Sequence, residues 1–186
     1  MRADFKVVLD ACVLANYGVC NLLLKLAEKP RLYQPCWSDE LLSETERTQL
    51  NDLAWPVELA KSFQEALRTQ FPEALVNDYG HLVERCANDP GDRHVLACAI
   101  QSKAELILTF NLRDFPEAAL GPWKVEAQHP QDYLITLYGI DPVIVLHKLE
   151  AIARKRGVSL GDHLIDLGRF LPVFARRVWD DVDESN

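Results

Sequence analysis

The chain has 186 residues, the size of one ordinary domain or of one domain with an appendage. Hydrophobic residues make up 48% and charged residues 26%, a globular composition that excludes a disordered chain, a collagen-like chain and a disulfide miniprotein. The formal net charge is -8, with 28 acidic and 20 basic residues. A protein that binds nucleic acid through a broad basic surface would normally have a positive net charge. Either the partner is not nucleic acid, or some of the acids form a metal site that supplies positive charge locally.

The cysteines and the apolar runs indicate where the protein works. The cysteine count is odd, at five, and no C-x-x-C pair is present, which favours isolated thiols in a reducing compartment. No uncharged apolar run is long enough to cross a bilayer, and the first ten residues lack the pattern of a secretory signal. We therefore expect a cytoplasmic protein with no membrane contact.

Short apolar runs alternate with segments of helical periodicity along most of the chain. The predicted strands cover residues 5–9, 32–37, 105–110 and about 123–127. The predicted helices cover residues 16–29, 38–50, a stretch from 56, 73–86 and 92–103. This alternation predicts an α/β fold, a three-layer α/β/α sandwich with a central parallel sheet.

The composition changes after residue 129. Helical patterns cover residues 142–157 and 159–171, and the tail is predicted to be helical throughout. Between Lys148 and Arg177 it carries seven basic and three acidic residues, opposite to the bias of the whole chain. We expect a domain over residues 1–129 and a helical C-terminal extension over 130–186 that packs on it. Contact of this extension with RNA or with a partner protein is a further hypothesis.

Three carboxylates are predicted to meet at one edge of the sheet. Asp10 ends a predicted strand, Asp92 opens a helix on its core-facing stripe, and Asp114 follows another strand. Each of the first two has a simpler explanation, which is that it caps the start of a helix. Together, however, they would repel one another unless a cation were bound. Oxygen-only ligands favour a hard metal, so Mg²⁺ or Mn²⁺ is the expected cofactor.

A fourth acid is expected from the helix that begins after Ser38. Glu44 and Glu46 lie on different stripes of this helix, and periodicity does not choose between them. Both could also belong to a solvated acidic face.

Four segments resemble the successive motifs of the PIN domain, the nuclease fold of VapC-like toxins. In chain order they are VVLDACVLA, SDELLSETERTQL, NDPGDRHVLACAI and LILTFNLRDFP. The resemblance covers about residues 5–127 and implies a metal-dependent endoribonuclease. It places the metal-binding and catalytic acids at Asp10, Glu44, Asp92 and a residue of the last loop, and it favours Glu44 over Glu46. The resemblance leaves this last position open between Asp114 and Asn111, which stands where some relatives carry aspartate and can still donate an oxygen.

Other residues near these acids are candidates for supporting roles. Asp89 and His94 flank Asp92, while Thr109 or Asn111 could orient the scissile phosphate; His94 could equally be a structural histidine. The resemblance also implies an RNA substrate, a small antitoxin partner and a homodimer. The alternative is a catalytically inactive PIN-like module that binds RNA or protein, which the retained acid set disfavours.

Overall fold

The computed structural model of the protein describes residues 4–183. The start of the predicted domain, residues 1–3, and the end of the predicted extension, residues 184–186, lie outside the described residues. A four-stranded parallel sheet has the strand order β2-β1-β3-β4. Val8 pairs with Cys36 on one side and with Ile107 on the other. The strands are β1 (Lys6–Leu9), β2 (Gln34–Cys36), β3 (Leu106–Leu108) and β4 (Glu126–Gln128).

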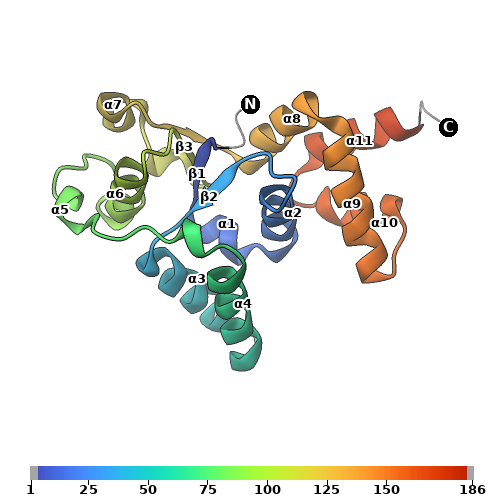
Figure 1. Ribbon diagram of the computed structural model, residues 1–186, viewed down its shortest axis with the longest axis horizontal. Helices are drawn as coiled ribbons and strands as arrows, with labels where there is room; N and C mark the ends of the chain where they lie inside the picture. The colour runs from blue at the N-terminus through green and yellow to red at the C-terminus, as the bar shows by residue number, and fades with distance from the viewer. Residues whose placement is uncertain (1–3, 184–186) are drawn as a thin grey trace.

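Helices cover both faces of this sheet, which confirms the α/β/α sandwich. Figure 1 shows α6 (Arg93–Ser102) on one side of the strands and α2 (Tyr17–Ala27) on the other. Helix α1 (Ala11–Ala15) follows β1 directly and packs against α3 (Asp39–Asn51). Beyond them lie α4 (Val57–Gln70) and the short helices η1 (Pro72–Ala74), α5 (Gly80–Val83), η2 (Pro90–Asp92), η3 (Leu112–Asp114), α7 (Glu117–Leu120) and η4 (Gly121–Trp123).

The strands have three or four residues each, and the central strands β1 and β3 are buried. Val7, Val8 and Leu9 have no exposed surface, as expected for a parallel strand covered on both faces. Pro35 has no N–H to donate, but β2 is an edge strand that pairs only with β1, so the missing donor is tolerated. Because β1 and β3 are parallel neighbours, with Leu9 opposite Leu108, their carboxyl ends lie side by side.

The tail after β4 is helical, as predicted, and packs outside α2. Figure 1 shows its last helices gathered on the right of the view, and α9 contacts α2. One continuous hydrophobic core joins Leu22 and Val8 with Leu149 and Phe174 from the tail. Within residues 4–183, no helix is long and apolar enough to span a bilayer. The tail helices are α8 (Pro130–Ile140), α9 (Pro142–Arg156), α10 (Leu160–Leu167) and α11 (Pro172–Asp183).

Some predicted helices were wrong in extent. No helix runs over residues 73–86: the backbone of Trp37 pairs with Leu75, and Asp78 has a positive φ of 61°, so the chain crosses this region as a loop between η1 and α5. The helix expected from Asn16 starts as predicted, but a separate five-residue helix, α1, precedes it. The helix expected over 159–171 ends at Leu167, and Pro172 opens a new one.

Candidate active site

Asp10 stands at the carboxyl end of β1 and is almost completely buried, with 4% of its surface exposed. It caps α1, because its Oδ1 accepts a hydrogen bond of 2.6 Å from the backbone N–H of Ala11. Its Oδ2 accepts from the Thr109 hydroxyl at 2.7 Å and from the Cys12 thiol at 3.1 Å. Burial is the largest influence and raises the pKa of Asp10, while these three hydrogen bonds oppose it. The capping role and a role at the site thus coexist in one side chain.

Thr109 and Cys12 fix the orientation of Asp10 from two chain segments. Thr109 follows β3, has no exposed surface, and its hydroxyl also accepts a hydrogen bond of 2.9 Å from the backbone N–H of Asn111. Burial and the charge of Asp10 raise the pKa of the Cys12 thiol to about 12, so it stays protonated and donates. Cys12 was missed as a site residue in the sequence. Its position two residues after Asp10 at the start of a helix was the available signal.

Asp92 lies at the junction of η2 and α6, and its side chain makes no capping hydrogen bond to α6. Burial is the largest cause that raises the pKa of Asp92 from 3.8 to about 6. Nearby negative charges raise it further, in the order Asp10, Asp114, Glu44 and Asp89. These four acids are therefore the ones whose charges reach Asp92.

Glu44 points from α3 toward the start of α6, where its Oε2 lies 3.3 Å from Nε2 of His94. The contact with His94 is the main cause that lowers the pKa of Glu44, against the effect of burial. Burial lowers the pKa of His94, but Glu44, Glu40 and the hydrogen bond between Nδ1 and the Gly91 carbonyl together raise it above its usual value. The contact between the half-buried Glu44 and the buried His94 thus favours the protonated form of the imidazole. The charge of Glu44, and not that of Glu46, is among those that act on Asp10 and Asp92.

The last loop brings Asp114 to the same group. It ends η3, is partly buried, and its Oδ1 lies 3.5 Å from Nε of the exposed Arg113. Its carbonyl accepts a hydrogen bond of 3.2 Å from the backbone N–H of Asp89, which ties the two loops together. The Asp89 side chain bonds the backbone N–H of Gly91 at 2.9 Å and so shapes the turn before Asp92. The side chain of Asn111 is exposed at the edge of this loop.

The donor set fits a hard divalent cation. Asp10, Glu44, Asp92 and Asp114 offer only carboxylate oxygens. Besides burial, the negative charges of the other three acids raise the pKa of Asp92, and a bound cation would offset these charges. In the described part of the chain, no three His, Cys, Asp or Glu side chains stand close enough together to form a ready-made metal site. The acids influence one another through their charges, and Asp10, Glu44, Asp92 and Asp114 are the residues that would hold the ion.

Comparison with known proteins agrees with this fold and these motifs. The family model described as "PIN domain" matches residues 4–113, which is more than half of the chain. The chain therefore belongs to the PIN domain family.

One curated relative within that family is similar over a shorter stretch. The "Putative ribonuclease VapC50" of Mycobacterium tuberculosis (strain ATCC 25618 / H37Rv) is 46% identical over 62 residues, which are 33% of this chain and 37% of that protein. The match thus spans little more than a third of the length of this relative. No solved structure matches the chain significantly.

Proposed function

We propose that this protein is a metal-dependent endoribonuclease that hydrolyses RNA phosphodiester bonds. The observation that carries the proposal is the placement of Asp10 at the carboxyl end of β1, Asp92 at the start of α6, Glu44 beside His94 and Asp114 in the loop after β3, with the charges of the other three acids acting on the partly buried Asp92. Membership of the PIN domain family and the similarity to a protein named as a putative ribonuclease support the same reaction.

Each residue of the site has its own role in this proposal. A bound Mg²⁺ or Mn²⁺ would supply positive charge for the phosphate and would lower the pKa of a water molecule. Asp10, Glu44, Asp92 and Asp114 would hold that ion, and the carboxylate of Asp10 or Asp92 would orient or deprotonate the attacking water. Thr109 and Cys12 keep the carboxylate of Asp10 in one orientation, so the site does not need to reorganise during the reaction. His94 holds Glu44 toward the start of α6.

The biological context is part of the same proposal. We infer that the protein is the toxin of a toxin–antitoxin pair, with a small antitoxin as partner and a homodimer as its assembly; the VapC name of the similar protein supports this. All five cysteines are free, which supports a cytoplasmic location.

The division of the chain is also a proposal. We propose a nuclease domain over residues 1–129 and a helical extension over 130–186 that packs on it. The family match ends at residue 113, before the extension begins, which supports the division. The extension shares a hydrophobic core with the preceding residues, which supports its packing on the nuclease domain.

A cleavage assay tests the proposed reaction. Purified protein is incubated with a mixed single-stranded RNA pool and Mn²⁺, beside an EDTA control and the Asp92→Asn variant. Asp132→Asn is the matched control, because it makes the same change of charge on the exposed surface of α8. We expect cleavage by the wild type and by Asp132→Asn, and none with EDTA or by Asp92→Asn. Equal cleavage by Asp92→Asn, or no cleavage by the wild type, would overturn the proposal.

A further inference from the structure

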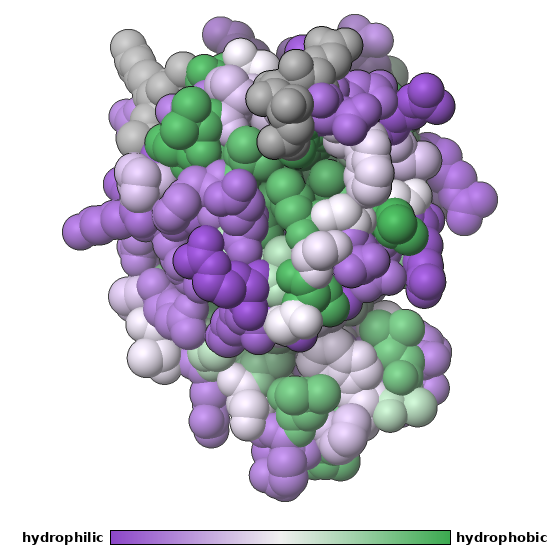
Figure 2. Space-filling view, turned by 90° about the vertical axis from the view of Figure 1, so that its right-hand side faces the viewer, coloured by the Kyte–Doolittle hydropathy of each residue, from purple (hydrophilic) through white to green (hydrophobic). Residues whose placement is uncertain are grey.

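A cavity of about 300 Å³ lies between the start of α2 and the helices α9 and α10, away from the acidic site. This volume is at the lower end of the range of small-ligand pockets. Figure 2 shows the side of the molecule on which the tail helices lie, where apolar patches are interspersed with hydrophilic side chains. The cavity is lined by Tyr17, Gly18, Asn21, Ile152, Arg156, His163, Asp166, Leu167, Arg169 and Phe170.

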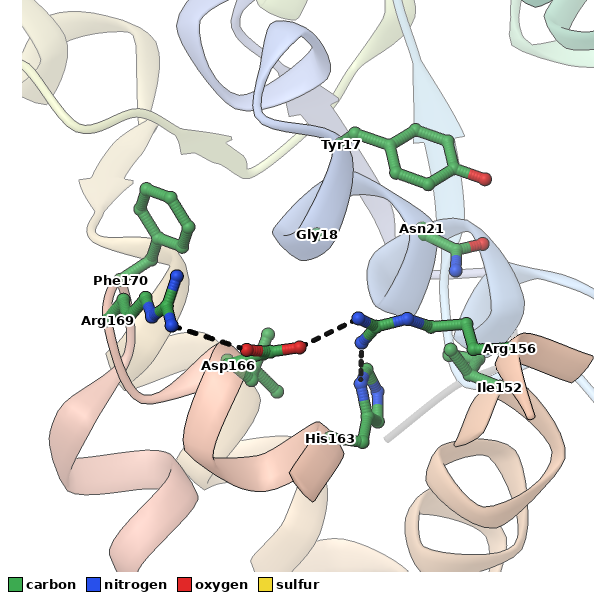
Figure 3. Close-up of a pocket in the computed structure, with 10 residues that line it drawn as sticks. Tyr17, Gly18, Asn21, Ile152, Arg156, His163, Asp166, Arg169 and Phe170 are labelled. Atoms are coloured by element: carbon green, nitrogen blue, oxygen red, sulfur yellow. Dashed lines mark hydrogen bonds and ion pairs between the residues drawn. The ribbon is translucent and has the colours of Figure 1, made fainter. Parts of the chain in front are cut away.

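Two arginines are held in this cavity by one aspartate. Nη2 of Arg156 lies 2.7 Å from Oδ2 of Asp166, and Nη2 of Arg169 lies 3.7 Å from Oδ1 of the same residue. Nη1 of Arg156 also donates to Nδ1 of His163 at 2.8 Å. Figure 3 shows these three contacts in a row across the cavity. Two guanidinium groups against one carboxylate leave one positive charge in excess, in a chain whose net charge is -8.

His163 orients Arg156 from the cavity wall. Burial, and then the charge of Arg156, lower the pKa of His163, so the ring is neutral and accepts at Nδ1. Its proton is therefore on Nε2, which is buried and has no hydrogen-bond partner among residues 4–183. Because Nε2 is buried, His163 acts in the cavity wall only through Nδ1, where it holds Arg156.

Exposed aromatic rings stand beside the charged groups. In Figure 3 the rings of Tyr17 and Phe170 rise above the ion pairs, one toward each side of the view. Tyr17 is 56% and Phe170 51% exposed, although both are large and apolar. The side-chain amide of Asn21 also lines the cavity, and no residue of the described chain bonds it. Aromatic faces next to guanidinium groups are the combination that binds bases and phosphates of single-stranded nucleic acid.

We propose that this cavity binds a nucleotide of single-stranded RNA, with the base against Tyr17 and Phe170 and the phosphate at Arg156 and Arg169. The choice of an RNA strand as the source of the nucleotide rests on the proposed nuclease function. Asp10 caps α1, and Tyr17 begins the next helix, so one helix of five residues separates the acidic site from the cavity.

Binding is measured without cleavage, so that the two proposals are tested separately. The probe is a fluorescein-labelled single-stranded RNA of about ten nucleotides, within the range of known binding-site lengths, and anisotropy is recorded in EDTA at two salt concentrations. Adenosine monophosphate and ribose 5-phosphate are titrated in parallel by calorimetry. The first compound represents a free nucleotide and the second lacks the base.

The variants test separately the stacking of a base on Tyr17, the charge of Arg169 and the access of RNA to the cavity. Tyr17→Ala removes the ring and Tyr17→Phe keeps it. Arg169→Ala removes an exposed cation, and Arg176→Ala on α11 is its matched control, since it also faces an aspartate at one helical turn. Gly18→Leu is an independent test, because Gly18 lines the cavity and a Cβ atom added there meets only Oδ1 of Asn16, at 3.9 Å.

We expect Tyr17→Ala to weaken RNA binding by about fivefold or more, as loss of one stacked base does, and Tyr17→Phe to bind like the wild type. Arg169→Ala and Gly18→Leu weaken binding, whereas Arg176→Ala does not. Tighter binding of RNA than of adenosine monophosphate supports a strand as the source, the reverse supports a free nucleotide, and ribose 5-phosphate binds least in both cases.

Unchanged RNA binding in Tyr17→Ala, Arg169→Ala and Gly18→Leu would overturn the inference. If these variants bind normally while the wild type cleaves RNA with Mn²⁺, the nuclease proposal stands and the cavity proposal fails. If the cavity variants lose binding while the wild type never cleaves RNA, the cavity proposal stands alone.

Discussion

Replacing Asp92 by asparagine is expected to stabilise the metal-free protein while it abolishes RNA cleavage. The folded state raises the pKa of Asp92 from 3.8 to about 6, so the folded protein binds this proton more tightly than the unfolded chain does. Stability is therefore lost as the pH rises through the interval between these two values. One pKa unit corresponds to about 1.4 kcal/mol, which gives about 3 kcal/mol as an upper bound near pH 7. Because Asp92 is partly exposed and screened by water, we expect a gain of about 1–2 kcal/mol for Asp92→Asn.

Urea unfolding in EDTA measures this gain. The free energy of unfolding of Asp92→Asn should exceed that of the wild type near pH 7, and the difference should shrink toward about pH 4, where the wild-type carboxyl is protonated. Asp132→Asn on the surface of α8 should show no such gain. A variant that is less stable than the wild type near neutral pH, or a gain of equal size at both pH values, would refute the account that burial and nearby acids raise the pKa of Asp92.

Three further changes test the parts of the site and of the fold. Thr109→Val removes a hydrogen bond to the Asp10 carboxylate and should lower the free energy of unfolding by about 1.5–3 kcal/mol in urea; Thr45→Val, whose hydroxyl bonds a neutral carbonyl, should lose less. Glu44→Gln should lose RNA cleavage in a gel assay while Glu46→Gln retains it, and the opposite pattern would reassign the fourth acid. Deletion of residues 141–186 removes the helix that packs on α2 and should abolish cooperative thermal unfolding; a soluble, fully active truncated chain would refute any contact of the tail with RNA.

The main elements of the fold could be predicted because their signals are local. Short runs between helical segments predicted all four strands near their observed places, and the alternation with helices predicted the parallel sheet. The predicted helix over 73–86 failed because tertiary contacts decide that region: Trp37 pairs with Leu75, and the apolar residues around it reach the core from a loop.

The acids of the candidate site were predictable to different degrees. Asp10 and Asp92 could be proposed from position, since one ends a strand and the other opens a helix. Periodicity did not separate Glu44 from Glu46, because the distinction depends on which side chain meets His94 across a long sequence gap. The role of Cys12 depends on contacts with Thr109 and Phe110, which the sequence spacing does not show.

Titration of the protein with Mn²⁺ by calorimetry tests the central claim most directly, namely that acids distant in the sequence form one cation site. The wild type should bind Mn²⁺ with a saturable isotherm, Asp92→Asn should bind at least about tenfold more weakly, and Glu46→Gln should bind like the wild type. Absence of binding by the wild type, or equal binding by Asp92→Asn, would contradict the account.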